Sequence, residues 1–376
     1  MTPFPRNAYR ELVPYVPDRR SVPVDLSDNT NLWGPHPAAA RVLAEADGAD
    51  LTRYPSGYGE ELKEAVARRY DIPLEAIATD CGSDDLLDSA FRASCDPGDR
   101  VTFPAPTFGM VPLLARMNAL EAHPIPSPNA DNASEGTPAS FLPPPEALLE
   151  PGPSAIYVCS PNNPTGEVAS REWLLTLLDA AGGPGGPVLV VDEAYAEFHD
   201  FSLLRQAPSS PRVVVTRTLS KAYGLAGLRV GYAVGDPELI HEIEKSRGPY
   251  KVGRIPEKAA AAAVADSGDW LTGIVSDVQR NRDRLRVELE ERGFRPLPSG
   301  ANFLFVPVGP SPEAGASPAT ESPPARLAIS LRKQGVAVRP FADLPGVGGG
   351  LRITVGPWEA MDRLLEGLDT ALQDGR

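Results

Sequence analysis

The sequence predicts an α/β protein with a mostly parallel β-sheet in a large domain and a smaller α/β domain near the C-terminus. Three observations lead to this prediction. The chain of 376 residues is longer than one average domain. Short runs rich in Val and Ile alternate with helical patterns, as in parallel sheets covered on both faces. A long helical pattern over Asp269–Arg292 then separates this alternation from two further strand candidates.

The predicted elements follow in order along the chain. Three buried strands are expected at Ala155–Ser160, Val188–Glu193 and Arg212–Thr218, because each is a short apolar run followed by polar or glycine-containing residues. A helix is expected over Ser170–Ala181 between the first two strands. In the long helix, Leu271, Ile274, Val275 and Val278 recur at helical spacing, and we expect this helix to bridge the two domains. After it, the runs 301–308 and 350–356 predict strands of a compact C-terminal unit.

Two segments rich in proline, serine and glycine interrupt this pattern. They cover Pro124–Pro153 and Val308–Pro324, and both are polar and aperiodic. Such composition is typical of surface insertions or linkers and not of a packed core. We therefore expect neither segment to contribute to the core.

Composition excludes several classes of function. Lys and Arg number 36 and Asp and Glu 50, a net charge of −14, so a nucleic-acid partner that needs a basic surface is not expected. No apolar run approaches the roughly 18 residues of a membrane span. Met1–Arg10 lacks the apolar stretch of a signal peptide, so no membrane partner and a cytoplasmic location are expected. The three cysteines form no CxxC pair and the four histidines are far apart, so no metal site is expected.

Polar residues follow the three predicted strands at the point where each strand ends. Asn163 follows the first strand, Asp192 ends the second with Tyr195 shortly after it, and Ser220 and Lys221 follow the third. Taken singly, each is a common cap, turn or solvated residue. Ligands of open α/β sheets bind beyond the carboxyl ends of the strands, and these residues meet at that edge. Their joint occurrence predicts an active site, and because no metal site is expected, chemistry beyond simple acid–base catalysis would need an organic cofactor.

The chain resembles the fold-type I pyridoxal-phosphate enzymes of the class I and II aminotransferase group, and most of all the histidinol-phosphate aminotransferases. The resemblance covers Tyr54 to Gly356 and rests on an ordered series of motifs: YPSGYGEELKEAVA, CGSDDLLD, PTFGMV, SPNNPTG, VVDEAY, TLSKAYGLAGLRVGY, ANFLF and LRITVG. It implies an N-terminal arm over 1–28, a large cofactor-binding domain over 29–270 with a seven-stranded sheet, and a small domain over 271–376. A Rossmann dinucleotide site is not expected, because GLAGLRVG does not open a first βαβ unit.

The resemblance also implies roles for the residues at the strand ends. Lys221 matches the lysine that condenses with the cofactor aldehyde and then carries a proton. Asp192 matches the carboxylate that keeps the pyridine nitrogen protonated. Tyr195 and Asn163 match the pair that hydrogen-bonds the phenolic oxygen of the cofactor. These assignments make Lys221, Asp192 and Tyr195 the catalytic candidates.

The cofactor phosphate needs hydrogen-bond donors and positive charge. Ser83 and Asp84 are expected in the first turn of a helix, whose free N–H groups bind phosphate. Ser220 and Arg229 match the remaining phosphate ligands of the same subunit. Tyr54 matches a tyrosine that reaches the phosphate of the neighbouring subunit, so the resemblance implies a homodimer with shared sites.

The resemblance implies one more cofactor contact, at Phe108, and four substrate-binding residues. Phe108 stands where many members carry the tyrosine that stacks on the cofactor ring, and a phenyl ring keeps the stacking face without the hydroxyl. Arg352 matches the arginine that binds the α-carboxylate, and Arg339 matches a second arginine. Tyr15 matches a tyrosine of the N-terminal arm that folds over the active site, and Asn29 resembles the asparagine of the family's NENP element.

The function that these residues imply is a transaminase acting on histidinol phosphate and 2-oxoglutarate in histidine biosynthesis. Alternatives with the same cofactor are an aromatic amino-acid aminotransferase, a threonine-phosphate decarboxylase and an enzyme of secondary metabolism. Transamination and decarboxylation differ in which Cα bond stands perpendicular to the cofactor ring, and the sequence does not reveal that orientation. A regulator that reuses the fold would be expected to lack the lysine or to carry a DNA-binding segment, and neither feature is found.

Overall fold

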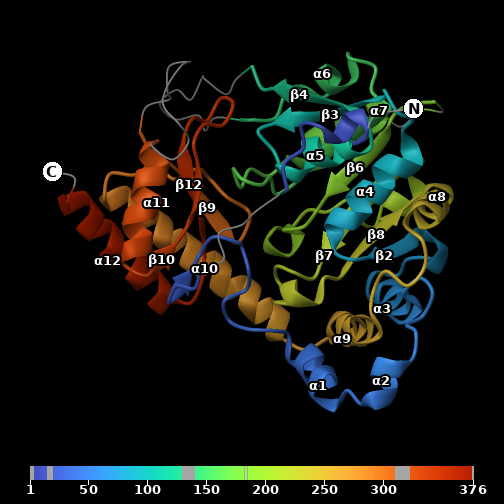
Figure 1. The fold of residues 1–376 in the computed structure, drawn as a ribbon, viewed down its shortest axis with the longest axis horizontal. Helices are drawn as coiled ribbons and strands as arrows, with labels where there is room; N and C mark the ends of the chain where they lie inside the picture. The colour runs from blue at the N-terminus through green and yellow to red at the C-terminus, as the bar shows by residue number, and fades with distance from the viewer. Residues whose placement is uncertain are drawn as a thin grey trace.

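The fold is taken from a computed structural model that describes residues 4–14, 20–128, 140–181, 183, 185–309 and 322–374. It consists of a seven-stranded sheet with helices on both faces and a smaller unit built on a three-stranded sheet (Figure 1). The sequence-based prediction of an α/β fold with a mostly parallel sheet and a smaller α/β part is confirmed.

The large sheet has the strand order β2-β8-β7-β6-β5-β3-β4. Its strands are β2 (Ile77–Asp80), β3 (Arg100–Ala105), β4 (Glu121–Pro126), β5 (Ala155–Cys159), β6 (Val188–Asp192), β7 (Val213–Thr218) and β8 (Gly231–Gly235). The three strands predicted from Val- and Ile-rich runs are β5, β6 and β7, which are adjacent and parallel. Only β8 runs antiparallel to its neighbours in this sheet. The carboxyl ends of the other six strands therefore lie at one edge.

Helices cover both faces of the large sheet. One face packs on α1 (Pro37–Glu45), α3 (Glu60–Tyr70), α7 (Arg171–Ala181) and α9 (Arg254–Ala265), and the other on α4 (Ser83–Ser94), α5 (Met110–Met117) and α8 (Pro237–Arg247). The central strands are buried on both sides, because Val191 belongs to the first apolar cluster and its neighbour Val190 to the second. This burial on both faces explains why the sequences of these strands are continuous apolar runs.

The smaller unit contains an antiparallel sheet in the order β11-β12-β9. Its strands are β9 (Phe303–Pro307), β11 (Arg339–Phe341) and β12 (Gly350–Thr354), and its helices are α11 (Pro323–Lys333) and α12 (Trp358–Asp374). The N-terminal part of the chain joins this unit, because β1 (Val24–Asp25) pairs in parallel with β10 (Val336–Ala337). The segment just before Asn29 is thereby tied to the C-terminal residues.

The long predicted helix is α10 (Trp270–Glu291), which runs between the two parts of the molecule (Figure 1). Its side chains Ile274, Val278, Leu285 and Leu289 are buried at helical spacing. It contacts η3 (Ala196–Phe198), which follows β6, as well as β9 and α12. The helix therefore links the loop after Asp192 to the smaller sheet.

The prediction for the segment Pro124–Pro153 is wrong at both ends. Pro124 and Pro126 lie in β4, the edge strand of the large sheet, where proline is tolerated because one side of the strand needs no partner. Near the other end, α6 (Pro145–Leu149) places Leu148 in the core with no exposed surface. Residues 129–139 and 310–321 of the two proline-rich segments lie outside the described residues. The second segment ends inside α11, where Pro324 is buried.

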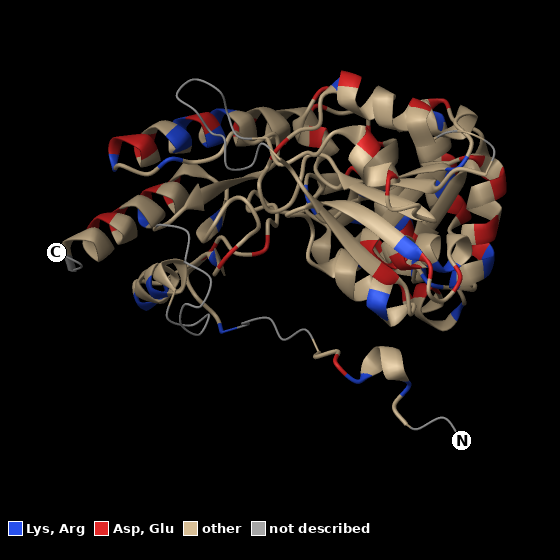
Figure 2. Ribbon diagram, turned by 90° about the horizontal axis from the view of Figure 1, so that it is seen from above, with Lys and Arg blue, Asp and Glu red and all other residues tan. Residues whose placement is uncertain are grey.

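Lys, Arg, Asp and Glu residues lie mainly on the helices and loops around the outside of the molecule, and few lie on the strands (Figure 2). In the described part of the chain, none of the helices combines the length and apolar character needed to cross a bilayer.

Candidate active site

A cavity of about 560 Å³ lies beyond the carboxyl ends of the parallel strands. Residues from both parts of the molecule line it, so the smaller sheet closes over the edge of the large one. It brings together most of the residues predicted from the sequence: Asn29, Ser83, Asp84, Phe108, Asn163, Asp192, Tyr195, Ser220, Lys221, Arg229, Arg339 and Arg352. These residues meet at the edge where open α/β sheets bind their ligands, as the sequence predicts.

Lys221 stands just after β7 with its amine directed into the cavity. The Nζ atom donates a hydrogen bond to the backbone carbonyl of Asp28 at 3.0 Å and lies 5.7 Å from the centre of the Tyr195 ring. Burial, together with the positive charge of Arg352, lowers the pKa of Lys221 to about 8. The charged amine is therefore easier to deprotonate than an ordinary lysine, and its neutral form can act as a nucleophile.

Asp192 ends β6 and is 3% exposed. Its Oδ2 accepts a hydrogen bond from the Tyr157 hydroxyl at 2.8 Å, and its Oδ1 accepts from the Ala194 amide at 3.1 Å and from Thr216 Oγ1 at 3.3 Å. Burial raises the pKa of Asp192 to about 6, while the hydrogen bond from Tyr157 lowers it. The carboxyl group is thus held in one orientation and is mainly ionised at neutral pH.

Tyr195 and Asn29 connect the cavity to the smaller sheet. Asn29 Nδ2 donates a hydrogen bond to the Tyr195 hydroxyl at 3.0 Å. The backbone of Asn29 is left-handed, with φ 54°, a conformation that asparagine adopts more readily than most residues. It is held there because its amide donates to Thr354 and its carbonyl accepts from Asn302. Burial raises the pKa of Tyr195 above its usual range, so its hydroxyl stays protonated at neutral pH.

Arg352 and Arg339 supply positive charge from the smaller sheet. Arg352 Nη1 donates to Asn163 Oδ1 at 2.7 Å, and Nη2 donates to the Ser27 carbonyl at 2.6 Å. Arg352 on β12 is the register partner of Arg339 on β11. Both side chains line the cavity, so one wall carries two guanidinium groups.

The first turn of α4 forms an anion cradle at the other end of the cavity. Gly82 precedes the helix with φ 83°, and a Cβ at this position would lie 2.6 Å from Nη2 of Arg229. A Cβ on Gly231 would lie 2.7 Å from the backbone nitrogen of Ser83. Two glycines thus allow the guanidinium and β8 to approach the helix N-terminus, where free N–H groups and the helix dipole attract an anion. Asp84 and Arg229 form an ion pair at 3.5 Å.

Two further predicted residues line the same cavity. Ser220 is 6% exposed, and its hydroxyl accepts a hydrogen bond from Thr218 at 2.9 Å. Phe108 comes after β3 and packs partly against the apolar cluster under α4 and α5. The Phe108 ring is therefore available as a flat apolar surface inside the cavity.

Among the described residues, Tyr54 is a predicted site residue that does not line the cavity. Tyr54 is 80% exposed, and its ring lies 5.0 Å from the ring of Tyr250. Tyr15 lies outside the described residues.

The sequence-based reasoning missed several lining residues. The Asp28 carbonyl accepts from Lys221, and the cavity is also lined by Thr107, Met110, Leu113 and Phe341. Tyr157 was missed as well, because its contact depends on a strand register that the sequence does not display. Tyr157 lies two positions before Cys159 and therefore on the same face of β5, and Cys159 is the register partner of Asp192. A hydroxyl two positions before Cys159 on the neighbouring strand can therefore reach the carboxylate.

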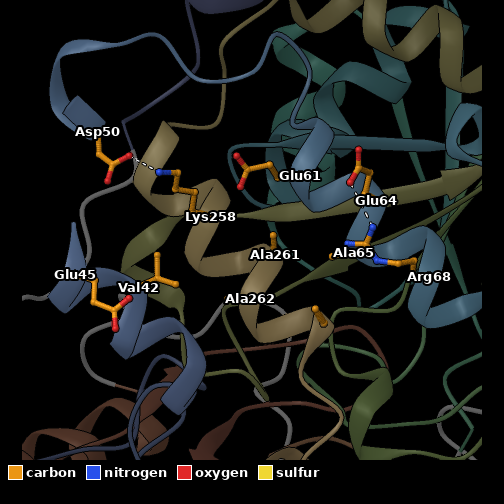
Figure 3. Close-up of a pocket in the computed structure, with 11 residues that line it drawn as sticks. Val42, Glu45, Asp50, Glu61, Glu64, Ala65, Arg68, Lys258, Ala261 and Ala262 are labelled. Carbon is orange, nitrogen blue, oxygen red and sulfur yellow. Dashed lines mark hydrogen bonds and ion pairs between the residues drawn. The ribbon is translucent and has the colours of Figure 1, made fainter. Parts of the chain in front are cut away.

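A second hollow of about 530 Å³ lies between α1, α3 and α9, away from these residues. Lys258 points to Asp50 of α2 (Gly48–Thr52), and Arg68 pairs with Glu64 one turn earlier in α3 (Figure 3). Alanines of α9 form part of its wall. None of the predicted site residues in the described ranges lines this hollow.

Comparison with known proteins agrees with the residues in the cavity. A family model described as aminotransferase class I and II matches residues 21–368. Histidinol-phosphate aminotransferase 1 of Nostoc sp. is 32% identical over 377 residues, which cover 99% of each chain. An aromatic amino acid aminotransferase of Mycobacteroides abscessus is 35% identical over 351 residues, 92% of each chain.

Among solved structures, histidinol-phosphate aminotransferase from Sinorhizobium meliloti, in complex with pyridoxal-5'-phosphate, superposes with a TM-score of 0.81. It is 24% identical and covers 98% of each chain, so this likeness concerns the fold. The family match extends over most of the sequence and includes the cavity residues. The chain therefore belongs to the class I and II aminotransferases, the pyridoxal-phosphate-dependent enzymes of fold type I that its motifs resemble.

Proposed function

We propose that this chain is a histidinol-phosphate aminotransferase, which exchanges an amino group between histidinol phosphate and 2-oxoglutarate. The observation that carries the proposal is the pair of guanidinium groups of Arg339 and Arg352 on one wall of the cavity. The donor has a dianionic phosphate, the acceptor has two carboxylates, and both use the cavity in alternate half-reactions. Guanidinium groups form charge-assisted hydrogen bonds with either kind of oxygen.

The residues in the cavity fit pyridoxal phosphate in three respects. The cradle of Ser83, Ser220 and Arg229, kept open by Gly82, would hold the phosphate group. The buried carboxylate of Asp192 would face the pyridine nitrogen. The amine of Lys221, with its lowered pKa, would meet the aldehyde.

When bound, pyridoxal phosphate supplies an aldehyde that condenses with amines and a ring that accepts electrons from the substrate Cα. Lys221 would first act as the nucleophile and, once displaced, would carry a proton on Nζ. Asp192 would keep negative charge beside the ring nitrogen. Tyr195, held by Asn29, and Asn163, held by Arg352, would donate hydrogen bonds that orient the ring.

An aromatic amino-acid aminotransferase is the second candidate. It is favoured by the apolar part of the cavity lining, formed by Phe108, Met110, Leu113 and Phe341. An aromatic amino acid would place its ring there but would offer one anionic group to two arginines. The two-arginine wall therefore supports the phosphorylated donor over the aromatic one.

We also propose a homodimer in which Tyr54 completes the phosphate site of the neighbouring subunit. Its exposure in the single chain supports this proposal, because a large aromatic side chain that is 80% exposed gains by burial against a partner.

Steady-state assays with 2-oxoglutarate as acceptor test the substrate. The proposal predicts that kcat/KM for histidinol phosphate exceeds the values for phenylalanine and tyrosine. A higher value for either aromatic amino acid would replace the proposal by the second candidate. Release of carbon dioxide from threonine phosphate would identify a decarboxylase instead.

A further inference from the structure

The contact between Tyr157 and Asp192 is buried in the middle of the large sheet. Tyr157 lies on β5 and has no exposed surface, and its hydroxyl donates to Oδ2 of Asp192 at 2.8 Å. The two residues come from adjacent parallel strands, and both strands are flanked by further strands. The hydroxyl therefore has little freedom to move away from the carboxylate.

The surroundings of Asp192 otherwise disfavour a negative charge. Burial and the nearby carboxyl of Asp84 both raise the pKa of Asp192, and the hydrogen bond from Tyr157 opposes them. The titratable and polar groups that face this carboxyl come from four parts of the chain: Asp84 of α4, Tyr157 and Cys159 of β5, Tyr195 after β6, and Thr216 of β7. The hydrogen bond from Tyr157, at 2.8 Å, is shorter than the one from Thr216, at 3.3 Å.

We propose that Tyr157 is a positioning residue for Asp192: its hydroxyl keeps the carboxylate ionised and oriented beside the site of the cofactor's pyridine nitrogen. The proposal rests on the ring-nitrogen role proposed for Asp192. Tyr157 itself does not line the cavity, so it acts through the carboxylate and not by direct contact. Hydrogen bonds to the charged form of a carboxyl group lower its pKa, which is the effect required here.

The test compares Tyr157→Phe with a matched substitution, Tyr232→Phe. Tyr232 is also buried in the large sheet, on β8, and its hydroxyl lies 3.2 Å from that of Tyr70. It belongs to the apolar cluster on the opposite face from Tyr157. Both substitutions remove one buried hydroxyl, but only one of these hydroxyls contacts Asp192.

The first measurement is the dissociation constant of pyridoxal phosphate for the full-length chain between pH 5 and 9. As the pH is lowered, the affinity of Tyr157→Phe for pyridoxal phosphate should begin to fall about one pH unit earlier than that of the wild type. The reason is that a hydrogen bond to a charged group is lost. At pH 5 this corresponds to about a ten-fold larger dissociation constant. Tyr232→Phe should follow the wild-type curve, and Thr216→Val, which removes a longer contact, should shift it less than Tyr157→Phe.

The second measurement is the ¹⁵N chemical shift of the pyridine nitrogen in chain loaded with ¹⁵N-labelled cofactor. A more basic Asp192 competes for the ring proton, so in Tyr157→Phe the resonance should move toward that of an unprotonated nitrogen. Unchanged affinity curves and shifts in Tyr157→Phe would overturn the proposal and leave Tyr157 as a core side chain. Asp192→Asn tests the role of Asp192 separately from that of Tyr157. If Asp192→Asn also leaves the affinity curve and the chemical shift unchanged, the role proposed for Asp192 is itself wrong.

Discussion

Arg339 and Arg352 lie directly opposite each other on adjacent antiparallel strands, and both side chains line the cavity. Residues paired in this way project from the same face of a sheet, so the two positive charges are close neighbours. Arg352 is also linked to the large sheet through Asn163. The strand pairing thus concentrates positive charge at the place where an anionic substrate would enter.

Replacing Arg339 by alanine should lower kcat/KM most for phosphorylated donors. We expect kcat/KM for histidinol phosphate to fall about ten- to a hundred-fold, because hydrogen bonds to charged groups contribute about 1.5–3 kcal/mol. The loss with phenylalanine should be smaller. Arg363→Ala, at an exposed position of α12, serves as the control and should change neither value. Equal losses with both donors would show that Arg339 does not discriminate by charge.

Replacing Lys221 by methionine should abolish transamination and stabilise the cofactor-free chain at pH 7. The pKa of Lys221 is lowered from 10.5 to about 8, so below pH 8 the folded chain must accommodate a disfavoured charge. The difference corresponds to at most about 3 kcal/mol. Unfolding free energies measured by denaturant titration should show this gain in full at pH 7.

The pH dependence of that gain has a definite sign. When the pKa of a group is lower in the folded chain than in the unfolded chain, the group's contribution to stability is present above the unfolded pKa. That contribution is lost as the pH falls through the folded pKa. The advantage of Lys221→Met should therefore shrink between about pH 8 and 10.5. Lys245→Met, which removes an exposed lysine paired with Glu242, serves as the control. A gain that is independent of pH across this window would contradict a lowered pKa at Lys221.

Gly82→Ala should weaken phosphate binding at the first turn of α4. A Cβ there meets Arg229 Nη2 at 2.6 Å and also requires a left-handed backbone, so both the guanidinium and the turn must shift. Gly98→Ala is the matched control, because Gly98 has φ 98° but no atom within 4 Å of an added Cβ. Both variants should lose about 1 kcal/mol or more of stability from backbone strain. Only Gly82→Ala should also raise the dissociation constant of pyridoxal phosphate, measured by absorbance titration.

Mixing two inactive variants tests whether Tyr54 completes the neighbouring site. Lys221→Ala and Tyr54→Ala homodimers should both lose activity, whereas a heterodimer would contain one site with both lesions and one intact site. Activity should therefore return after subunit exchange, which native mass spectrometry can verify. A mixture of Lys221→Ala and Asp192→Ala is the control and should stay inactive, because both residues line the cavity of their own chain. Exchange without recovery in the first mixture would mean that each site is self-contained.

The central part of the site could be predicted from the sequence because strand ends are local features. Asn163, Asp192 and Lys221 each follow a recognisable buried strand, and parallel strands bring their carboxyl ends to one edge. The first turn of α4 was predictable for the same reason, since a glycine followed by polar residues before an apolar pattern indicates a helix start.

Other features depend on pairings that the sequence does not display. The register that places Arg339 opposite Arg352 is set by the smaller sheet, whose β11 is only three residues long. The strand β4 was missed because its prolines suggested a loop, and only its edge position makes them acceptable. Tyr157 was missed because, in a strand buried on both faces, the pattern does not distinguish a core aromatic from a carboxylate's partner.

A single-turnover experiment tests the proposed function most directly. The chain loaded with pyridoxal phosphate is mixed with one amino donor in the absence of 2-oxoglutarate, and absorbance follows conversion of the cofactor to pyridoxamine phosphate. This isolates the half-reaction in which Arg339 and Arg352 would meet the donor phosphate. We predict that histidinol phosphate reacts much faster than phenylalanine, tyrosine or threonine phosphate at equal concentrations. A rate for phenylalanine equal to or above that for histidinol phosphate would contradict the proposed function.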